Sequence, residues 1–467
     1  MTTGILILLI FCLLLAFSFE FVNGFHDTAN AVATVIYTNS LKPTVAVVWS
    51  GMWNFLGLIF SVYLFSAGVS VAMGILNLLP IEALTDTSIS HGVAMILAVL
   101  LTALLWNLGT WFFGIPASSS HTLIGSILGI GLAFYFINGK DAVNWGKAQD
   151  IGLSLLVSPL VGFALSIIVM FIFKRTIKSE IIYKEPVPGK KPPVWVRAIL
   201  IFTCTLVSFF HGNNDGQKGI GLIMLILIVL APSYYAIKSD YPVEKTYTEM
   251  AHMSKMIYLI DTTKLSAKER TDIAKTKDRC AQLVGLIENK KTVEQIDSLK
   301  RFEVRKDILM ISKNAEKIGL GENSSLSTRE KSELKGVIKE AKKITDYAPE
   351  WVIILISISL GLGTMVGWKR IVKTIGEKIG KQHMSYAQGA SAEIVASATI
   401  GMASAWGLPV STTHVLSSGV AGSMVAKKGL KNLQPKTIKT IAMAWVLTLP
   451  VTMVLSGALF LLFRMIF

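Results

Sequence analysis

Charged residues are scarce in this sequence of 467 residues. They make up 16% of the chain, whereas soluble domains carry about 25%. Hydrophobic residues account for 52%, and the mean hydropathy is +0.56. These values exclude an ordinary soluble protein and predict a chain whose main solvent is lipid.

Cysteines and metal-binding motifs are also scarce. Cys12, Cys204 and Cys280 share no close spacing, so they predict neither a disulfide framework nor a cysteine metal site. No His-Glu-x-x-His pattern occurs, and the apolar stretches hold almost no arginine. We therefore expect no cofactor and no hydrolytic site, and we predict that the protein is not an enzyme.

The net charge of +15 does not indicate nucleic-acid binding, because the basic residues gather in short loops beside apolar runs. Such clusters lie at 174–178, 369–373 and 427–431. Short cytoplasmic loops of membrane proteins carry this excess of Lys and Arg. The clusters therefore predict which loops face the cytoplasm.

Apolar runs recur at lengths near the ~20 residues that cross a bilayer as a helix. They cover 4–22, 44–66, 91–113, 150–173, 198–210 with a continuation at 219–232, 349–367, 384–406 and 440–466. Two more segments, 115–137 and 408–426, begin with proline and hydroxyl residues, and we expect broken or hairpin spans there. The first run lacks the features of a signal peptide, so we expect it to be retained.

The segment 233–346 differs from the rest of the chain. It holds 23 Lys and Arg and 18 Asp and Glu. Its apolar residues follow a helical period, as at Met250, Met253 and Ile257. We predict an inserted helical domain outside the bilayer, whose role stays open between a dimer contact, a partner site and a spacer.

Two motifs occur twice, in the same order. Residues 24–30 (GFHDTAN) align with 212–218 (GNNDGQK), and residues 116–123 (PASSSHTL) align with 409–416 (PVSTTHVL). The offsets are 188 and 293, and their difference of 105 is close to the length of the insert. A duplicated unit with one insertion in its second copy explains both offsets.

We predict an all-α polytopic membrane protein made of two inverted repeats with about five spans each. The predicted parts are 1–175 (first repeat), 176–197 (basic cytoplasmic linker), 198–232 (start of the second repeat), 233–346 (insert) and 347–467 (remainder of the second repeat). An odd number of spans per repeat makes the copies inverted, as in many secondary transporters. The same count places the insert in the periplasm.

Four acidic residues fall in otherwise apolar stretches, where each needs a partner or a function. They are Glu20, Asp27, Asp215 and Glu393, and the two aspartates are matched by the repeat. Glycine and asparagine beside each aspartate predict local unwinding and a small cation site. The alternative is that the aspartates hold helices together by hydrogen bonds.

The Pro-hydroxyl motifs are suited to an anion. Hydroxyl groups and free N–H groups at a helix start carry the positive end of the helix dipole. Two such helix starts could surround a tetrahedral oxyanion with neutral donors. The alternative is that the Ser and Thr side chains only cap helices.

The repeat is not symmetric everywhere. Lys218 stands where the first copy has Asn30, and it could pair with an aspartate or add a charge for the anion. Glu20 and Glu393 have no acidic counterpart in the other copy, so they are candidates for coupling. His26 and His211 lie beside the aspartates, where titration near neutral pH could sense protons.

Six segments closely resemble the inorganic phosphate transporter (Pit) family, and most of all bacterial low-affinity phosphate permeases. They are 24–34, 116–123, 210–219, 363–368, 386–389 and 409–416. The resemblance implies an inverted-repeat phosphate:cation symporter of the inner membrane, often a homodimer. It implies phosphate binding at Ser118, Ser119, Ser120, Ser411, Thr412 and Thr413 and cation-linked positions at Asp27, Asn30 and Asp215. To these we add Lys218 for phosphate, and Asn213, Glu20 and Glu393 for the coupling ion.

The family signature has asparagine where this chain has Lys218, which puts a sodium site in the second half in doubt. We therefore expect proton-coupled import of phosphate, with a divalent metal able to travel as neutral metal-phosphate. The alternatives are a sodium-coupled phosphate symporter and a permease for another oxyanion such as sulfate or arsenate. Two alternatives come from other classes of protein. A membrane enzyme acting on phosphorylated lipid would need a positioned base and a metal or arginine clamp. A regulatory receptor would use the insert as its working part.

Overall fold

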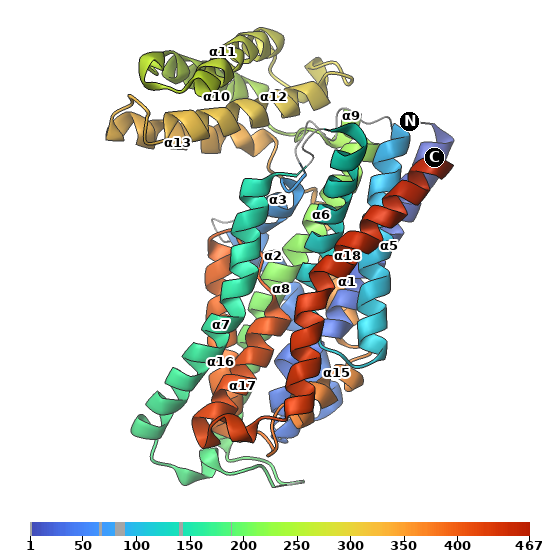
Figure 1. Ribbon diagram of the computed structural model, residues 1–467, viewed down its shortest axis with the longest axis vertical. Coiled ribbons are helices and arrows are strands. Elements are labelled where there is room, and N and C mark those ends of the chain that lie inside the picture. Colours follow the sequence, from blue (N-terminus) through green and yellow to red (C-terminus); the bar gives the residue numbers. More distant parts are fainter. Residues whose placement is uncertain (1, 65–67, 80–88, 140–142, 188) are drawn as a thin grey trace. The chain divides into compact units, whose positions relative to one another are not determined.

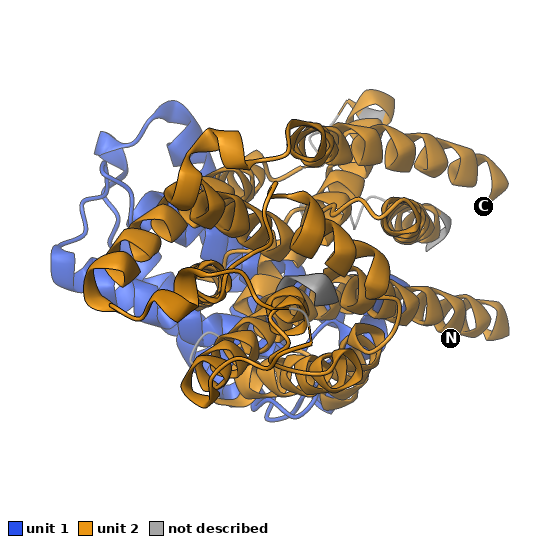
Figure 2. Cartoon of the chain, turned by 90° about the horizontal axis from the view of Figure 1, so that it is seen from below, with its two compact units in different colours: residues 1, 226–347 blue, residues 2–225, 348–467 orange. Residues whose placement is uncertain are grey.

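The computed structural model describes residues 2–64, 68–79, 89–139, 143–187 and 189–467, without the side chains at 28–30, 89–90 and 138. Within these ranges the chain is helical and holds no β-strand, apart from an isolated bridge between Gly380 and Leu433. The predicted all-helical class is confirmed. Backbone contacts divide the chain into two compact units, one of 226–347 and one of 2–225 with 348–467 (Figure 2).

The larger unit consists of long apolar helices that run side by side (Figure 1). They are α1 (Thr3–Tyr37), α2 (Pro43–Leu64), α5 (Ile89–Phe112), α6 (Ser119–Asn138), α7 (Trp145–Thr176), α8 (Val194–Leu230, whose last residues belong to the smaller unit), α14 (Glu350–Thr364), α16 (Tyr386–Ala405), α17 (Thr412–Lys428) and α18 (Pro435–Ile466). Shorter helices are α3 (Ser70–Leu76) and α15 (Lys369–Lys373), which continues as a π-helix over Thr374–Lys378.

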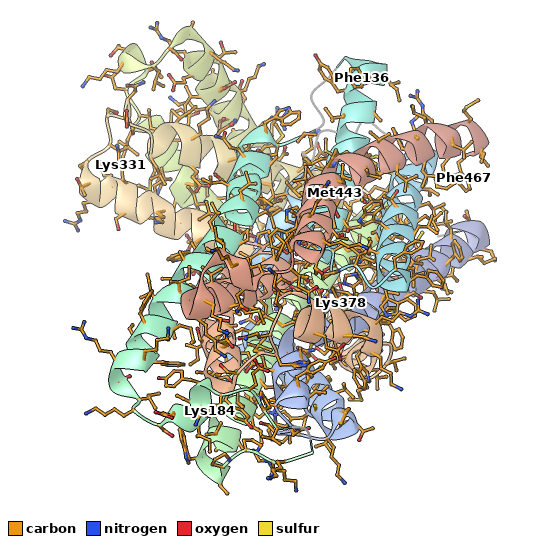
Figure 3. All side chains as sticks on the ribbon, turned by 60° about the horizontal axis from the view of Figure 1, so that its bottom comes forward. Phe136, Lys184, Lys331, Lys378, Met443 and Phe467 are labelled. Carbon is orange, nitrogen blue, oxygen red and sulfur yellow. The ribbon has the colours of Figure 1, made fainter. Side chains whose placement is uncertain are left out.

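Seven of the described helices are long and apolar enough to cross a membrane, namely α1, α2, α5, α6, α7, α8 and α18. An eighth candidate combines α14 with 369–378, which bend by 54° at a short break. Their outer faces carry exposed apolar side chains, such as Phe136, Met443 and Phe467 (Figure 3). Because water does not tolerate so large an apolar surface, the chain is a multi-pass membrane protein.

The helices that carry the two aspartate motifs are continuous. We expected unwinding around Asp27 and Asp215, but α1 stays helical through 24–30 and α8 through 212–218. The predicted broken helices at these motifs are therefore wrong. The polar interruption between the apolar runs 198–210 and 219–232 lies inside the single helix α8.

The glycines of these motifs serve helix packing rather than backbone freedom. A Cβ atom added at Gly24 would collide with the backbone carbonyl of Leu360 on α14. A Cβ atom at Gly212 would collide with the backbone of Asn54 on α2. Small residues that bring helix backbones together are the usual means of helix packing in membranes. Close packing therefore accounts for these glycines in continuous helices.

The Pro-hydroxyl motifs form the turns of two helical hairpins. Residues 113–118 link α5 to α6, and residues 406–411 link α16 to α17. The side chains of Ser118 and Ser411 cap the two new helices by accepting hydrogen bonds from the backbone N–H groups three residues later. The hairpins therefore point two helix N-termini into the unit.

Helices far apart in sequence form the tightest packing. α1 packs on α14, α6 on α18, and α7 on α17, while glycine contacts join α2 to α8. Each half of the chain thus supplies helices that pack against the other half. The core of the unit is built from both halves of the chain together.

The smaller unit is a bundle of α10 (Val243–Tyr258), α11 (Ala267–Ile287), α12 (Arg301–Asn314) and α13 (Thr328–Ala341), preceded by the short α9 (Pro232–Tyr235). The periodic apolar residues expected inside, such as Met250, Met253 and Ile257, are buried. Arg305 is also buried, and it donates hydrogen bonds to the carbonyls of Ala236 and Thr345. This side chain ties the segment that enters the bundle to the segment that leaves it.

Candidate anion and cation site

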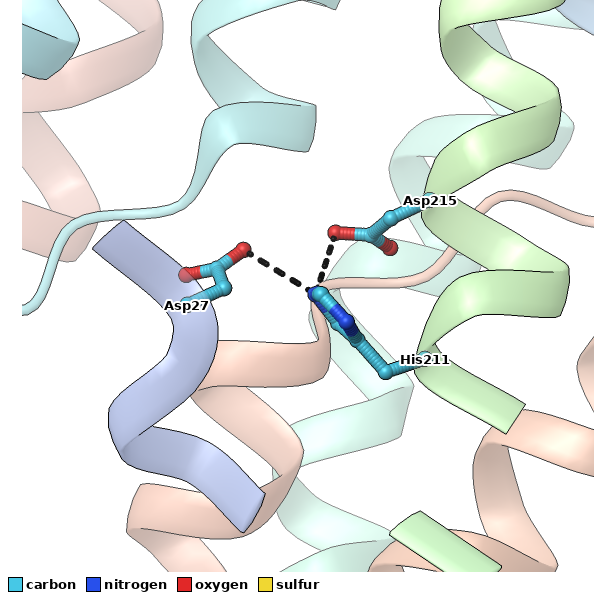
Figure 4. A group of neighbouring side chains, drawn as sticks. All are labelled: Asp27, His211 and Asp215. Atoms are coloured by element: carbon cyan, nitrogen blue, oxygen red, sulfur yellow. Dashed lines mark ion pairs between the residues drawn. The ribbon is translucent and has the colours of Figure 1, made fainter. Parts of the chain in front are cut away.

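Two buried aspartates face each other across a histidine. Asp27 comes from α1, and Asp215 and His211 lie one turn apart on α8 (Figure 4). His211 Nε2 lies 3.8 Å from Asp27 Oδ2 and 3.3 Å from Asp215 Oδ2. One ligand atom of each residue lies within 4.8 Å of the other two, so this triad could hold a metal ion. Carboxylate and imidazole donors suit a divalent cation.

The hydroxyl residues of both hairpins reach these aspartates. Ser119 on α6 donates a hydrogen bond of 3.2 Å to Asp27, and Thr413 on α17 donates one of 2.5 Å to the same carboxylate. Thr412 donates a hydrogen bond of 3.3 Å to Asp215. Three of the six hydroxyl groups predicted for phosphate therefore meet the two carboxylates predicted for the cation.

Ser118 and Ser411 have a different role in this arrangement. Their Oγ atoms accept hydrogen bonds of 3.2 and 3.1 Å from the backbone N–H groups of His121 and His414. This is the N-cap geometry that satisfies an unpaired donor at a helix start. The alternative that these side chains cap helices therefore applies to the first hydroxyl residue of each motif, Ser118 and Ser411.

Lys218 points into the same cluster from α8. Its Nζ atom donates to Asp215 Oδ1 and Ser120 Oγ, both at 2.5 Å, and to the carbonyl of Val410 at 2.8 Å. Of the two roles considered for Lys218, the structure shows the pairing with an aspartate. An ammonium group has three N–H donors, and all three are used here.

A second layer of polar residues positions the cluster. His26 Nδ1 lies 3.3 Å from Asp27 Oδ1, and its Nε2 lies 3.2 Å from the Thr110 hydroxyl. Asn54 Oδ1 lies 3.0 Å from His211 Nδ1. Asn54 was not predicted as a site residue, and His211 was considered only as a proton sensor beside the aspartates. Two features of the sequence could have indicated these residues. Asn54 is the single amide side chain in the apolar run 44–66, and His211 precedes Asp215 by four residues, which is about one helical turn.

Asn214 holds the second hairpin against α8. It donates to the Leu408 carbonyl at 3.1 Å and accepts from the backbone N–H of Val410 at 3.2 Å. The neighbouring Asn213, which was predicted for the coupling ion, accepts hydrogen bonds from Ser61 and Gln217. The Asn30 side chain lies outside the described residues.

The two other buried carboxylates lie in separate surroundings. Glu393 on α16 accepts hydrogen bonds from Thr34 on α1 and Thr203 on α8. Glu20 receives only a long hydrogen bond of 3.4 Å from Asn23, and in the described part of the chain its Oε1 has no hydrogen-bond partner. It packs against the backbone of α8 at Gly219, next to Lys218.

The two histidines that follow the hydroxyl runs stack on each other. The ring centroids of His121 and His414 are 4.5 Å apart, and His414 stacks on Trp445 at 4.2 Å. The stack joins the starts of α6 and α17. It therefore fixes the spacing of the two hairpin tips that surround the aspartates.

Residues 23–456 match the model of the phosphate transporter family. The chain is 41% identical to the low-affinity inorganic phosphate transporter PitB of Escherichia coli (strain K12), covering 98% of this chain and 96% of that protein. It is 40% identical to PitA of the same organism with the same coverage. It is also 40% identical to the low-affinity inorganic phosphate transporter of Buchnera aphidicola subsp. Acyrthosiphon pisum, covering 95% and 94%.

A solved structure of a protein named the sodium-dependent phosphate transporter matches with a TM-score of 0.55 at 20% identity, covering 98% of this chain and 100% of that chain. At this identity the match shows a likeness of fold. The names of these similar proteins all describe transporters rather than enzymes.

Proposed function

The chain belongs to the phosphate transporter family, and on this premise we propose that it imports inorganic phosphate across a bacterial inner membrane by symport with a cation. One observation carries the proposal. Hydroxyl groups from both hairpins converge on the two buried aspartates. Donors for an anion and acceptors for a cation thus share one site.

This arrangement requires a cation to accompany the anion. Phosphate held by Ser119, Thr412 and Thr413 would lie beside two carboxylates. Like charges about 4 Å apart repel by about 4 kcal/mol at an effective dielectric constant of 20. Lys218 supplies one fixed positive charge against two aspartates and the substrate, so a mobile cation must supply the rest.

We propose protons as the coupling ion, with phosphate able to enter as a neutral complex with a divalent metal. The triad of Asp27, His211 and Asp215 supports the metal as part of the cargo, because it gathers two carboxylates and an imidazole beside the hydroxyl groups. Sodium is the alternative, and the sodium dependence named for the structural relative favours it. A proton or a sodium ion would each neutralise the carboxylate charge that Lys218 leaves unbalanced.

The helix packing supports two inverted repeats of five helices. The repeat would match α1, α2, α5, α6 and α7 with α8, α14, α16, α17 and α18. Under this match, the packing of α1 on α14 corresponds to that of α8 on α2, and the packing of α6 on α18 corresponds to that of α17 on α7. Relative motion of such repeats is the usual route to alternating access. We further propose a homodimer with the segment 233–346 in the periplasm.

Uptake of labelled phosphate into proteoliposomes tests the function. The purified protein is reconstituted, and pH, sodium and magnesium gradients are imposed one at a time. We expect uptake driven by an inward proton gradient and increased by magnesium. The carrier function is wrong if no gradient drives uptake, and the proton coupling is wrong if only sodium drives it.

Competition experiments separate the oxyanions. Arsenate is nearly isosteric with phosphate and should compete for the same hydroxyl donors. Sulfate differs in protonation near neutral pH, so excess sulfate should leave phosphate uptake unchanged. Strong inhibition by sulfate would favour a broader oxyanion permease.

A further inference from the structure

Lys218 is surrounded by the oxygen atoms of a cation site. Its ammonium group is buried and contacts a carboxylate oxygen of Asp215, the hydroxyl of Ser120 and the carbonyl of Val410. The Val410 carbonyl is free of helical hydrogen bonds because it precedes the first turn of α17. Carboxylate, hydroxyl and carbonyl oxygens are the ligands that hard metal cations prefer.

The first half of the chain makes the corresponding contacts without a lysine. The repeat matches Ser119 with Thr412, and each donates to the aspartate of its own half, at 3.2 and 3.3 Å. The repeat also matches Ser120 with Thr413. Thr413 donates directly to Asp27, whereas Ser120 donates to the Val410 carbonyl and accepts from Lys218.

Lys218 therefore lies between Ser120 and Asp215. The equivalent pair, Thr413 and Asp27, forms a direct hydrogen bond. The charge of Lys218 balances Asp215, and its three donors leave none for an anion. Separating a buried ion pair leaves an uncompensated charge and is strongly destabilising, which favours a fixed position for the ammonium group. The side chain thus behaves as a permanent occupant of the pocket and not as a group that binds and releases substrate.

We propose that the Lys218 ammonium is a tethered cation that fills the cation site of the second half, and that it determines how many mobile cations accompany each phosphate. With Lys218 present, mobile monovalent cations bind on the Asp27 side only. With a neutral oxygen ligand in its place, the pocket of Asp215, Ser120 and Val410 accepts one further small monovalent cation. Only the transport measurement below rests on the proposed symport.

The first test measures cation binding without transport. Full-length wild type, Lys218→Asn and Lys218→Met are unfolded by heat in detergent, with lithium, sodium or potassium chloride replacing choline chloride at constant ionic strength. Asparagine offers an oxygen ligand, while methionine fills the space and offers neither charge nor oxygen ligand. We expect Lys218→Asn to gain an additional, saturable shift of about 3 °C in one of the alkali cations, and wild type and Lys218→Met to lack it.

Two outcomes of this measurement overturn the proposal. The first is a cation response of Lys218→Asn equal to that of wild type. If Lys218→Asn does not fold in choline, we expect one of the alkali cations to restore a monodisperse protein. Failure to fold in all three cations is the second outcome that overturns the proposal.

The second test measures charge movement. In proteoliposomes held at −100 mV, one additional cation per phosphate adds about 2.3 kcal/mol to the driving force. Phosphate accumulation by Lys218→Asn should then exceed that of wild type by about 50-fold at steady state, with the alkali cation at equal concentration on both sides. Equal accumulation contradicts the tethered cation. If wild type itself carries no phosphate, the proposed function fails, and the thermal measurement still tests Lys218.

Discussion

Thr413 donates a hydrogen bond to Asp27, although the two residues lie 386 positions apart. The bond joins the hairpin of the second half to the aspartate helix of the first half. A hydroxyl can donate to a carboxylate or to a phosphate oxygen, but its single proton serves one acceptor at a time. If phosphate binds at the hairpins as proposed, it would draw this proton away from Asp27 and change the environment of the aspartate, which would couple the two sites.

Neutralising either aspartate should stop transport. We expect Asp27→Asn and Asp215→Asn each to lower phosphate uptake by at least about 100-fold. Asp27→Asn removes a charged ligand of the mobile cation, and Asp215→Asn leaves the buried ammonium group of Lys218 without its carboxylate partner. Uptake of labelled phosphate into proteoliposomes measures the effect, and size-exclusion chromatography with thermal unfolding shows that each variant is folded. Near-normal uptake in either variant would assign that aspartate to helix packing alone.

The hydroxyl residues should separate into two groups. Ser118→Ala removes an N-cap and should cost about 1 kcal/mol of stability, with little change in KM for phosphate. Thr413→Val conserves the side-chain shape and removes the donor at Asp27, so it should raise KM with a smaller effect on Tm. Uptake kinetics and thermal unfolding of both variants provide the comparison. A rise in KM for Ser118→Ala equal to that of Thr413→Val would return Ser118 to phosphate binding.

Much of the fold was predictable because lipid imposes simple requirements. The apolar runs at 44–66, 150–173 and 440–466 correspond to α2, α7 and α18, since a helix must satisfy its own backbone polar groups in a bilayer. The periodic apolar residues of the insert predicted its buried face. These predictions depended only on pattern and length.

The role of the motif glycines could not be predicted from the sequence. Glycine near Asp27 and Asp215 is compatible with an unwound helix and equally with a tight helix crossing. The choice depends on which backbone lies opposite, and α14 and α2 supply those backbones from elsewhere in the chain. Local composition does not contain that information.

The candidate site shows the same limit. The repeat brought Asp27 and Asp215 to notice, but it did not show that His211 lies between them. Nor did it show that Ser118 is a cap while Ser119, one residue later, reaches an aspartate. One residue changes the direction of a side chain at a helix start by about 100°, and the sequence pattern treats all three serines alike.

Glu393 is a buried carboxylate outside the aspartate cluster, and its role in coupling can be tested separately. Both of its oxygens accept hydrogen bonds from threonines, Thr34 and Thr203, and in the described part of the chain no basic side chain pairs with it. A buried carboxylate without a fixed partner needs a proton or a mobile cation. We expect Glu393→Gln to lower uptake by at least about tenfold and to weaken its dependence on the imposed gradient.

The control for Glu393 is Thr203→Val, which removes one donor and keeps the carboxylate. It should retain most of the uptake and the full dependence on the gradient. Unchanged coupling in Glu393→Gln, measured as uptake against the imposed pH or sodium gradient, would mean that this carboxylate only holds α1, α8 and α16 together.

The contact between α2 and α8 should be intolerant of any added atom. In Gly212→Ala the new Cβ would overlap the backbone of Asn54, and backbone atoms cannot move aside as a flexible side chain can. Because this crossing lies one residue from His211, we expect loss of monodisperse protein or a large drop in Tm, and loss of uptake. Gly109 on α5 is the matched control, since a Cβ there meets no atom within 4 Å. Gly109→Ala should fold normally and gain slightly in helix stability, and equal damage in both variants would show that any alanine, not the α2–α8 contact, is responsible.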